Sequence, residues 1–204
     1  MPKIELTLTD TTTQQLAQLA AQYNMPLAEL LSQGIERRWP ELKPGVQNWM
    51  PRQQWDALVR GDNCPLCAEV TSSEAANAHG VTISDLGISR LRLAANQSVM
   101  GYCVLICRMH VRELYHLSAA DRAQFVADLT RTGQALETVF QPVKMNFEML
   151  GNAVPHLHCH IKPRYYGDPA PAAPIWPDQH PHWLSADEMA ARVALIHAAL
   201  EVGS

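Results

Sequence analysis

The sequence PHLHCHIKPRYYGD, residues 155–168, places histidines at every second position: His156, His158 and His160. In a β-strand, alternate side chains share a face and lie about 6.6 Å apart. The pattern therefore predicts three imidazoles that project together from one strand. The apolar residues between them are expected to face a hydrophobic core: Leu157, Cys159 and Ile161. A single histidine on a strand is usually an ordinary surface residue, but three in strict alternation indicate either a metal site or a site that handles phosphate.

Imidazole suits phosphorus chemistry because its neutral form is nucleophilic and its unperturbed pKa is about 6.5. Attack on an α-phosphorus gives a nucleotidyl-imidazole, from which imidazole leaves when water or another acceptor arrives, and this is covalent catalysis. The central histidine, His158, is the natural nucleophile because it has a like neighbour on each side. Those neighbours can bind phosphate oxygens or protonate the leaving group.

The longer stretch LGNAVPHLHCHIKPRYYGD, residues 150–168, resembles the signature of the histidine-triad (HIT) superfamily, in its dinucleoside-polyphosphate-hydrolase-like branch. The resemblance runs from about Cys64 to Asp168. One departure is Lys162, which stands where the pattern has a second apolar residue, at a position that we expect to be a strand end. The resemblance implies an α+β fold in which helices flank an antiparallel sheet.

The resemblance also implies roles for individual residues. His158 would accept the nucleoside monophosphate, and His160 would contact phosphate and donate a proton to the leaving oxygen. Asn152 and Asn96 match family positions that bind phosphate and hold the nucleotide, and His156 would contact substrate unless it binds a metal. Arg164 matches an arginine for which a surface role and a phosphate contact both remain open.

A second motif, NCPLC, places Cys64 and Cys67 at a spacing that lets two thiolates share one tetrahedral ion. A redox role for this pair is disfavoured because no thioredoxin-like strand–helix pattern surrounds it. The resemblance supplies two further ligands, as in zinc-bearing HIT proteins and galactose-1-phosphate uridylyltransferases: His110 and His156. We therefore expect structural zinc, bound by Cys64, Cys67, His110 and His156. Three other cysteines are expected to pack in the core: Cys103, Cys107 and Cys159.

Residues 1–40 read as a separate unit. An alternating segment at residues 3–9 predicts a strand, Asp10 offers an N-cap for a first amphipathic helix, and Pro26 can open a second. This strand–helix–helix order resembles the ribbon-helix-helix fold, which forms when two chains pair their strands. The outward face of that strand carries only one cation, so we expect a homodimerisation unit and disfavour DNA binding.

The rest of the chain reads as a connector, residues 41–63, and a HIT domain, residues 64–204. ISRLRLAANQ predicts a strand with one wet face, and GYCVLICRMH predicts a buried strand. Capped helical patterns follow Ser118 and Ser185. The 204 residues carry a formal net charge of −4, which argues against a general polyanion-binding surface. Neither a signal peptide nor a membrane span is recognisable, and we expect a reducing cytoplasm and no membrane partner.

The sequence thus predicts a nucleotide hydrolase that cleaves a phosphoanhydride or phosphoramidate bond, in dinucleoside polyphosphates or related nucleotides, through a nucleotidyl-histidine intermediate. Two alternatives stay open: a nucleotidyltransferase of the same superfamily, or a regulator that binds nucleotide or DNA without turnover. The uridylyltransferase relatives replace the third histidine by glutamine, so His160 favours hydrolysis.

Overall fold

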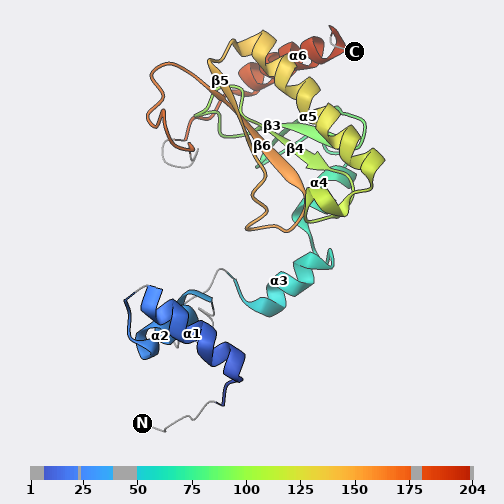
Figure 1. Cartoon of the computed structure of the whole chain (residues 1–204). Helices are drawn as coiled ribbons and strands as arrows, with labels where there is room; N and C mark the ends of the chain where they lie inside the picture. Colours follow the sequence, from blue (N-terminus) through green and yellow to red (C-terminus); the bar gives the residue numbers. More distant parts are fainter. Residues whose placement is uncertain (1–6, 23, 39–49, 176–180, 203–204) are drawn as a thin grey trace. The chain divides into compact units, whose positions relative to one another are not determined.

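The computed structural model describes residues 7–22, 24–38, 50–175 and 181–202. The chain divides into two compact units, Met1–Arg52 and Gln53–Ser204, which are described separately (Figure 1). None of the helices in these described ranges is long and apolar enough to cross a membrane.

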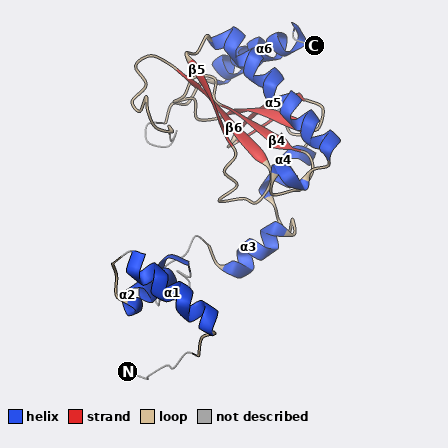
Figure 2. Ribbon diagram, in the orientation of Figure 1, coloured by secondary structure: helices blue, strands red, loops and turns tan. Residues whose placement is uncertain are grey.

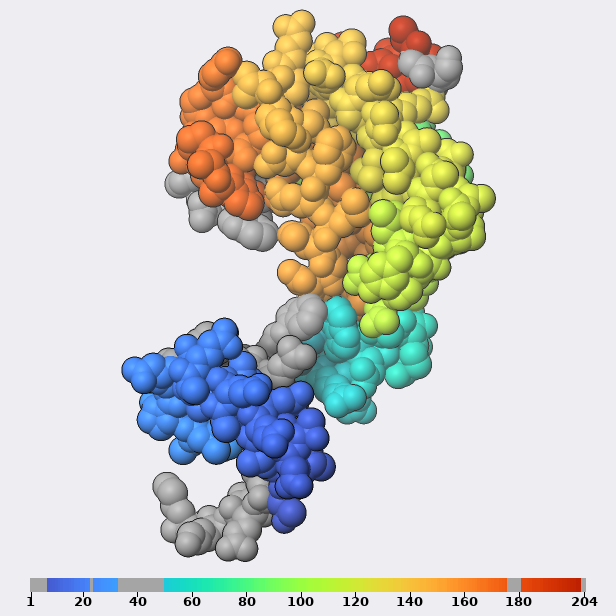
Figure 3. Space-filling model, viewed as in Figure 1, coloured from blue at the N-terminus to red at the C-terminus, as the bar shows by residue number. Residues whose placement is uncertain are grey.

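Unit 1 contains two helices that contact each other, α1 (Asp10–Gln22) and α2 (Leu27–Arg38) (Figure 1). Their atoms form the blue group of the space-filling view (Figure 3). Thr9, rather than Asp10, caps α1, because its Oγ1 accepts a hydrogen bond from the Thr12 amide (3.3 Å). Pro26 opens α2 as expected, since its carbonyl accepts the first helical hydrogen bonds. The predicted strand at residues 3–9 falls largely outside the described residues, and residues 7–9 are not in a strand.

Unit 2 is built on a six-stranded sheet in which every neighbouring pair is antiparallel, in the order β1-β2-β3-β4-β6-β5. The strands are β1 (Ala76–Asn77), β2 (Gly80–Asp85), β3 (Ser89–Ala94), β4 (Cys103–Cys107), β5 (Lys144–Glu148) and β6 (His158–Arg164). The helices are α3 (Arg52–Val59), α4 (Pro65–Thr71), the short η2 (Leu114–His116), α5 (Ala119–Phe140) and α6 (Ala186–Val202). The expected α+β architecture is confirmed.

The hydrophobic core lies between the sheet and the long helices α5 and α6, which pack on one side of it (Figure 2). Ser118 caps α5 by accepting from the Asp121 amide, and Ser185 and Glu188 form a capping box before α6. As predicted, Cys159 and Ile161 of β6, and Leu157 just before it, face this core. Cys103 and Cys107 of β4 also lie in the core, as predicted.

The opposite face of the sheet carries polar side chains, and here three local expectations are wrong. The polar face of β3 is not wet, because Arg92 is only 5% exposed. Lys162 is not at a strand end: β6 continues to Arg164, and the Lys162 side chain is buried. His156 precedes β6 instead of lying in it, so its ring does not follow the alternation of His158 and His160.

Candidate metal centre and active site

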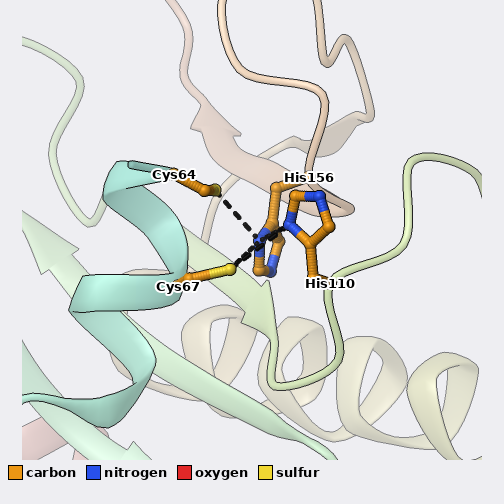
Figure 4. A group of neighbouring side chains, drawn as sticks. All are labelled: Cys64, Cys67, His110 and His156. Atoms are coloured by element: carbon orange, nitrogen blue, oxygen red, sulfur yellow. Dashed lines mark hydrogen bonds between the residues drawn. The ribbon is translucent and has the colours of Figure 1, made fainter. Parts of the chain in front are cut away.

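Four side chains converge where α4 approaches the start of β6 (Figure 4). Cys64 is the N-cap of α4, Pro65 occupies its first turn, and Cys67 follows one turn later on the same side. Gly61, in the preceding turn, has φ +88°, a left-handed conformation that favours glycine, and it lies next to the His110 ring. The candidate ligand atoms all lie within 4.8 Å of one another.

The distances in this cluster match a tetrahedral ion. The Cys67 Sγ atom lies 3.2 Å from Nδ1 of His110 and 3.5 Å from Nδ1 of His156, and the two Nδ1 atoms are 3.3 Å apart. Zn–S bonds of about 2.3 Å and Zn–N bonds of about 2.05 Å at a tetrahedral angle require S···N and N···N separations of about 3.5 and 3.4 Å. These three separations are therefore close to those expected around a tetrahedral ion.

The protonation of the two imidazoles also favours a cation. Nε2 of His156 lies 2.7 Å from the Cys107 carbonyl, and Nε2 of His110 lies 3.1 Å from the Val59 carbonyl. A carbonyl can only accept, so both Nε2 atoms carry the proton and both Nδ1 atoms present lone pairs. Two imidazole lone pairs and two sulfur atoms thus face one another, which is a donor set suited to a tetrahedral cation. The carbonyls are thus the outer partners that orient metal-binding histidines.

Burial shapes the titration of these ligands. Burial, reinforced by a hydrogen bond and the charge of Cys64, raises the pKa of the Cys67 thiol to about 11. Burial also lowers the pKa of His156, against the opposing effect of the Cys107 carbonyl. Burial thus favours the neutral form of His156, which is the form of histidine that coordinates a metal.

A cavity of about 670 Å³ opens on the polar face of the sheet. His158 and His160 line it, whereas His156 is fully buried in the cluster and is not among the lining residues. Apolar side chains surround much of the cavity, among them Leu66 of α4 and Ile106 of β4. This volume lies within the range of small-molecule sites, which are typically concave and largely apolar with few polar groups.

His158 presents the opposite ring nitrogen from His156. Its Nδ1 lies 2.6 Å from the His156 carbonyl, which makes Nδ1 the donor and leaves the lone pair on Nε2. Burial lowers the pKa of His158 below its ordinary value, in opposition to that backbone hydrogen bond. His158 is therefore a neutral imidazole whose Nε2 lone pair is free to react.

His160 pairs with a residue that the sequence reasoning missed. The Tyr102 hydroxyl lies 2.7 Å from its Nδ1, and the His158 and His160 rings meet edge to face with centroids 4.9 Å apart. Burial, with further contributions from the charges of His158 and Lys162, lowers the pKa of His160 to about 4. His160 is thus neutral at physiological pH.

Two buried cations also line the cavity, each next to a carboxylate. Arg92 of β3 pairs with Glu69 of α4, and Lys162 of β6 donates to the Glu148 carboxylate (2.8 Å) and the Ile175 carbonyl (2.9 Å). Position parity could have identified Lys162, because it continues the face of His158 and His160. Arg92 could not be assigned to the cavity from the sequence, since alternation alone does not show that α4 covers its strand.

The two asparagines singled out from the sequence both line the cavity. Asn152 lies exposed in the loop before β6. The Asn96 side-chain oxygen accepts hydrogen bonds from the amides of Ser98 and His182, both at 3.0 Å. Arg164 is not a surface residue: it is 7% exposed and pairs with Asp168.

The comparisons with known proteins agree with this geometry. Residues 78–167 match the family model of the HIT domain. A histidine triad protein from Bradyrhizobium japonicum is 27% identical with a TM-score of 0.56, covering 60% of this chain and 91% of its own. One from Marinobacter aquaeolei VT8 is 27% identical with a TM-score of 0.57, covering 62% and 93%. A Zn-bound histidine triad family protein from Mycobacterium smegmatis shares the fold, at 22% identity and a TM-score of 0.50, covering 69% and 94%.

No curated protein matches the sequence. The family model and the solved structures agree: residues 78–167 are similar to HIT domains, and the fold around the histidine pair is that of solved histidine triad proteins.

Proposed function

We propose that this protein is a nucleotide hydrolase that cleaves a phosphoanhydride bond of dinucleoside polyphosphates or related nucleotides through a covalent adduct on His158. The observation that carries the proposal is the Nε2 lone pair of His158, which the backbone carbonyl of His156 leaves free beside the cavity. A neutral imidazole with its proton on the far nitrogen is the form that attacks phosphorus.

The proposed hydrolysis takes place in two steps. Nε2 of His158 attacks the α-phosphorus, a P–N bond forms, and the P–O bond to the leaving group breaks with its electron pair on that oxygen. Water then attacks the same phosphorus, the P–N bond breaks, its electron pair returns to Nε2, and the nucleoside monophosphate leaves as a proton is lost to solvent. Splitting one difficult displacement into two easier ones lowers the barrier.

His160 has the character of a hydrogen-bond donor more than of a strong acid. If the Tyr102 hydroxyl donates to Nδ1 of His160, the Nε2–H of that ring is available to a non-bridging or leaving oxygen. The pKa of His160, lowered to about 4, leaves little imidazolium at neutral pH. A polyphosphate leaves as an anion, whereas an amine needs a proton, so this site favours anhydrides over phosphoramidates. Asn152, in the loop at the cavity wall, is placed to donate to phosphate.

We propose structural zinc as the ion of the Cys₂His₂ cluster: Cys64, Cys67, His110 and His156. The ion would supply a cross-link rather than catalysis, because all four positions are taken by protein ligands and no open site remains. It would hold α4, which forms one wall of the cavity through Leu66 and Glu69, against the start of the histidine strand. In this assignment His156 positions the strand and does not contact substrate. A HIT-fold neighbour from Mycobacterium smegmatis is described as Zn-bound.

For residues 1–40 we propose homodimerisation rather than DNA binding. None of the residues of α1 is buried, and apolar side chains of unit 1 stay exposed, including Leu8, Leu19 and Leu27. A second copy would cover such side chains. We also propose a reducing cytoplasm as the setting of this protein.

The test is a panel of diadenosine tri- and tetraphosphate, mononucleoside triphosphates and adenosine phosphoramidate, with products followed by mass spectrometry. The proposal expects a nucleoside monophosphate from the dinucleotides and slower release from the phosphoramidate. In ¹⁸O-labelled water, one label in the monophosphate marks hydrolysis, whereas transfer to an added phosphate acceptor without label would identify a transferase. Binding without any product would replace the hydrolase with a nucleotide sensor.

A further inference from the structure

The rim of the cavity carries an indole that neither the triad nor the metal cluster uses. Trp183 lines the cavity and is 63% exposed. It lies in the segment that precedes α6, far in sequence from the other lining residues. Because Trp183 lines the same cavity as His158 and His160, its indole borders the space that a substrate of this site would occupy.

The backbone around Trp183 is held in place on two sides. His182 donates its amide to the Asn96 side-chain oxygen (3.0 Å), its carbonyl accepts from the Gln97 amide (2.8 Å), and Trp183 forms an antiparallel bridge with Asn96. Two residues later the capping box of Ser185 and Glu188 begins α6. The ring is thus presented on fixed backbone while its side chain remains open, which is the arrangement of a preorganised contact surface.

The order of residues along the sheet places Trp183 at one end of the triad face. His158 is in register with Ile106, an apolar residue that also lines the cavity. His160 follows it, then Tyr102, whose carbonyl accepts from the amide of Ala94. Asn96, two residues beyond Ala94, is the bridge partner of Trp183. His160 and Tyr102 therefore lie between the nucleophile and the indole.

We propose that Trp183 stacks on the base of the leaving nucleotide when the substrate is a dinucleoside polyphosphate. This inference rests on the proposed function. The enclosed apolar wall beside His158 receives the transferred nucleoside, the phosphates pass His160, and the second base meets the exposed ring at the rim. Base–aromatic stacking tolerates any base, because every base has a π-face.

The experiment measures binding in the full-length His158→Asn protein, in which no adduct forms, so that it does not depend on turnover. The probes are diadenosine tetraphosphate and adenosine tetraphosphate, which have the same phosphate chain and differ in the second adenosine. We expect Trp183→Ala to weaken the binding of diadenosine tetraphosphate about tenfold and to change the binding of adenosine tetraphosphate less than twofold. Trp183→Phe should restore most of the lost affinity. Tyr166→Ala is the matched control, since Tyr166 is 93% exposed and does not line the cavity.

Two other binding outcomes would overturn the inference. An equal loss of affinity for both probes would mean that the indole contacts the transferred nucleoside, or that Trp183 only maintains the structure of the cavity. No loss for either probe would remove it from the substrate site, and a change in molar mass by light scattering would assign it to contact between copies. If the dinucleotide binds and responds to Trp183→Ala but the wild-type protein releases no product, the subsite stands and the proposed hydrolase fails.

Discussion

His156 and His158 are two residues apart, have the same side chain, and serve two different sites. At His156 the Cys107 carbonyl holds Nε2, so Nδ1 points into the metal cluster. At His158 the carbonyl of His156 holds Nδ1, so Nε2 is left for the cavity. The contrast shows that a backbone carbonyl decides which nitrogen of a histidine is available, and thereby whether the ring presents its lone pair to the Cys₂His₂ cluster or to the cavity.

If the cluster and the cavity are separate sites, the largest loss of turnover should come from a substitution in the cavity. We expect His158→Ala to reduce turnover of diadenosine polyphosphates by at least about a thousandfold, because the covalent route is lost. Metal content by elemental analysis and the melting temperature should stay close to those of the wild type. His197→Ala, at an exposed position on α6, is the control. Comparable turnover in the His158 and His197 variants would show that His158 is not the nucleophile.

Substitutions in the Cys₂His₂ cluster should instead change metal content and thermal stability. We expect Cys64→Ser with Cys67→Ser to abolish bound metal and to lower the melting temperature by about 10 °C, because the cross-link between α4 and the histidine strand is lost. Calorimetry combined with elemental analysis checks this, and wild-type protein treated with a chelator should behave like the variant. Purified native protein without metal would contradict the assignment of a zinc site.

The pH dependence of stability tests the burial of His160 in the cavity. The pKa of His160 is about 4 in the fold and about 6.5 in the unfolded chain, so between these values the unfolded chain binds more protons. Stability contributed by the neutral ring is therefore complete above pH 6.5 and is lost as the pH falls towards 4.

Urea unfolding at several pH values measures this effect against a His160→Gln variant. We expect the wild-type free energy of unfolding to fall more steeply between pH 6.5 and 4, by up to about 1.4 kcal/mol per pH unit. Parallel curves for the two proteins would mean that His160 titrates normally in the fold.

The smallest effect on catalysis should come from unit 1. We expect removal of residues 1–40 to halve the molar mass measured by light scattering while turnover per active site changes less than twofold. An electrophoretic mobility shift assay with the full chain provides the second readout. Specific DNA binding that disappears with residues 1–40 would replace dimerisation with a regulatory role for this unit.

The strand pattern of the sequence was sufficient to predict the α+β fold and the core face of β6, because alternation and capping are local. It was not sufficient for His156, which leaves the strand: its position depends on Cys107, a contact 49 residues away. Lys162 and Arg92 were misjudged for the same reason, since their burial depends on Glu148 and on the covering helix α4.

Spacing within CPLC indicated a metal pair, but which other residues complete the cluster could be inferred only by family resemblance. In the structure, His110 and His156 meet because β4 and β6 are neighbours and their adjoining loops are hydrogen-bonded, with the Leu157 amide donating to the Val111 carbonyl (2.6 Å). No sequence pattern indicated that Tyr102 and Trp183 line the cavity. Both depend on which loops border the cavity, and loop packing leaves no periodicity in a single sequence.

The most direct measurement is capture of the adduct itself. Wild-type protein is mixed with diadenosine tetraphosphate for milliseconds and quenched in denaturant at alkaline pH, because acid hydrolyses phosphoramidates, and its peptides are examined by mass spectrometry. Our account predicts adenylylation on the peptide that contains residues 155–168, localised to His158 and absent from the His158→Ala protein. Rapid product formation with an unmodified peptide at every time point, or an adduct on another residue, would contradict it.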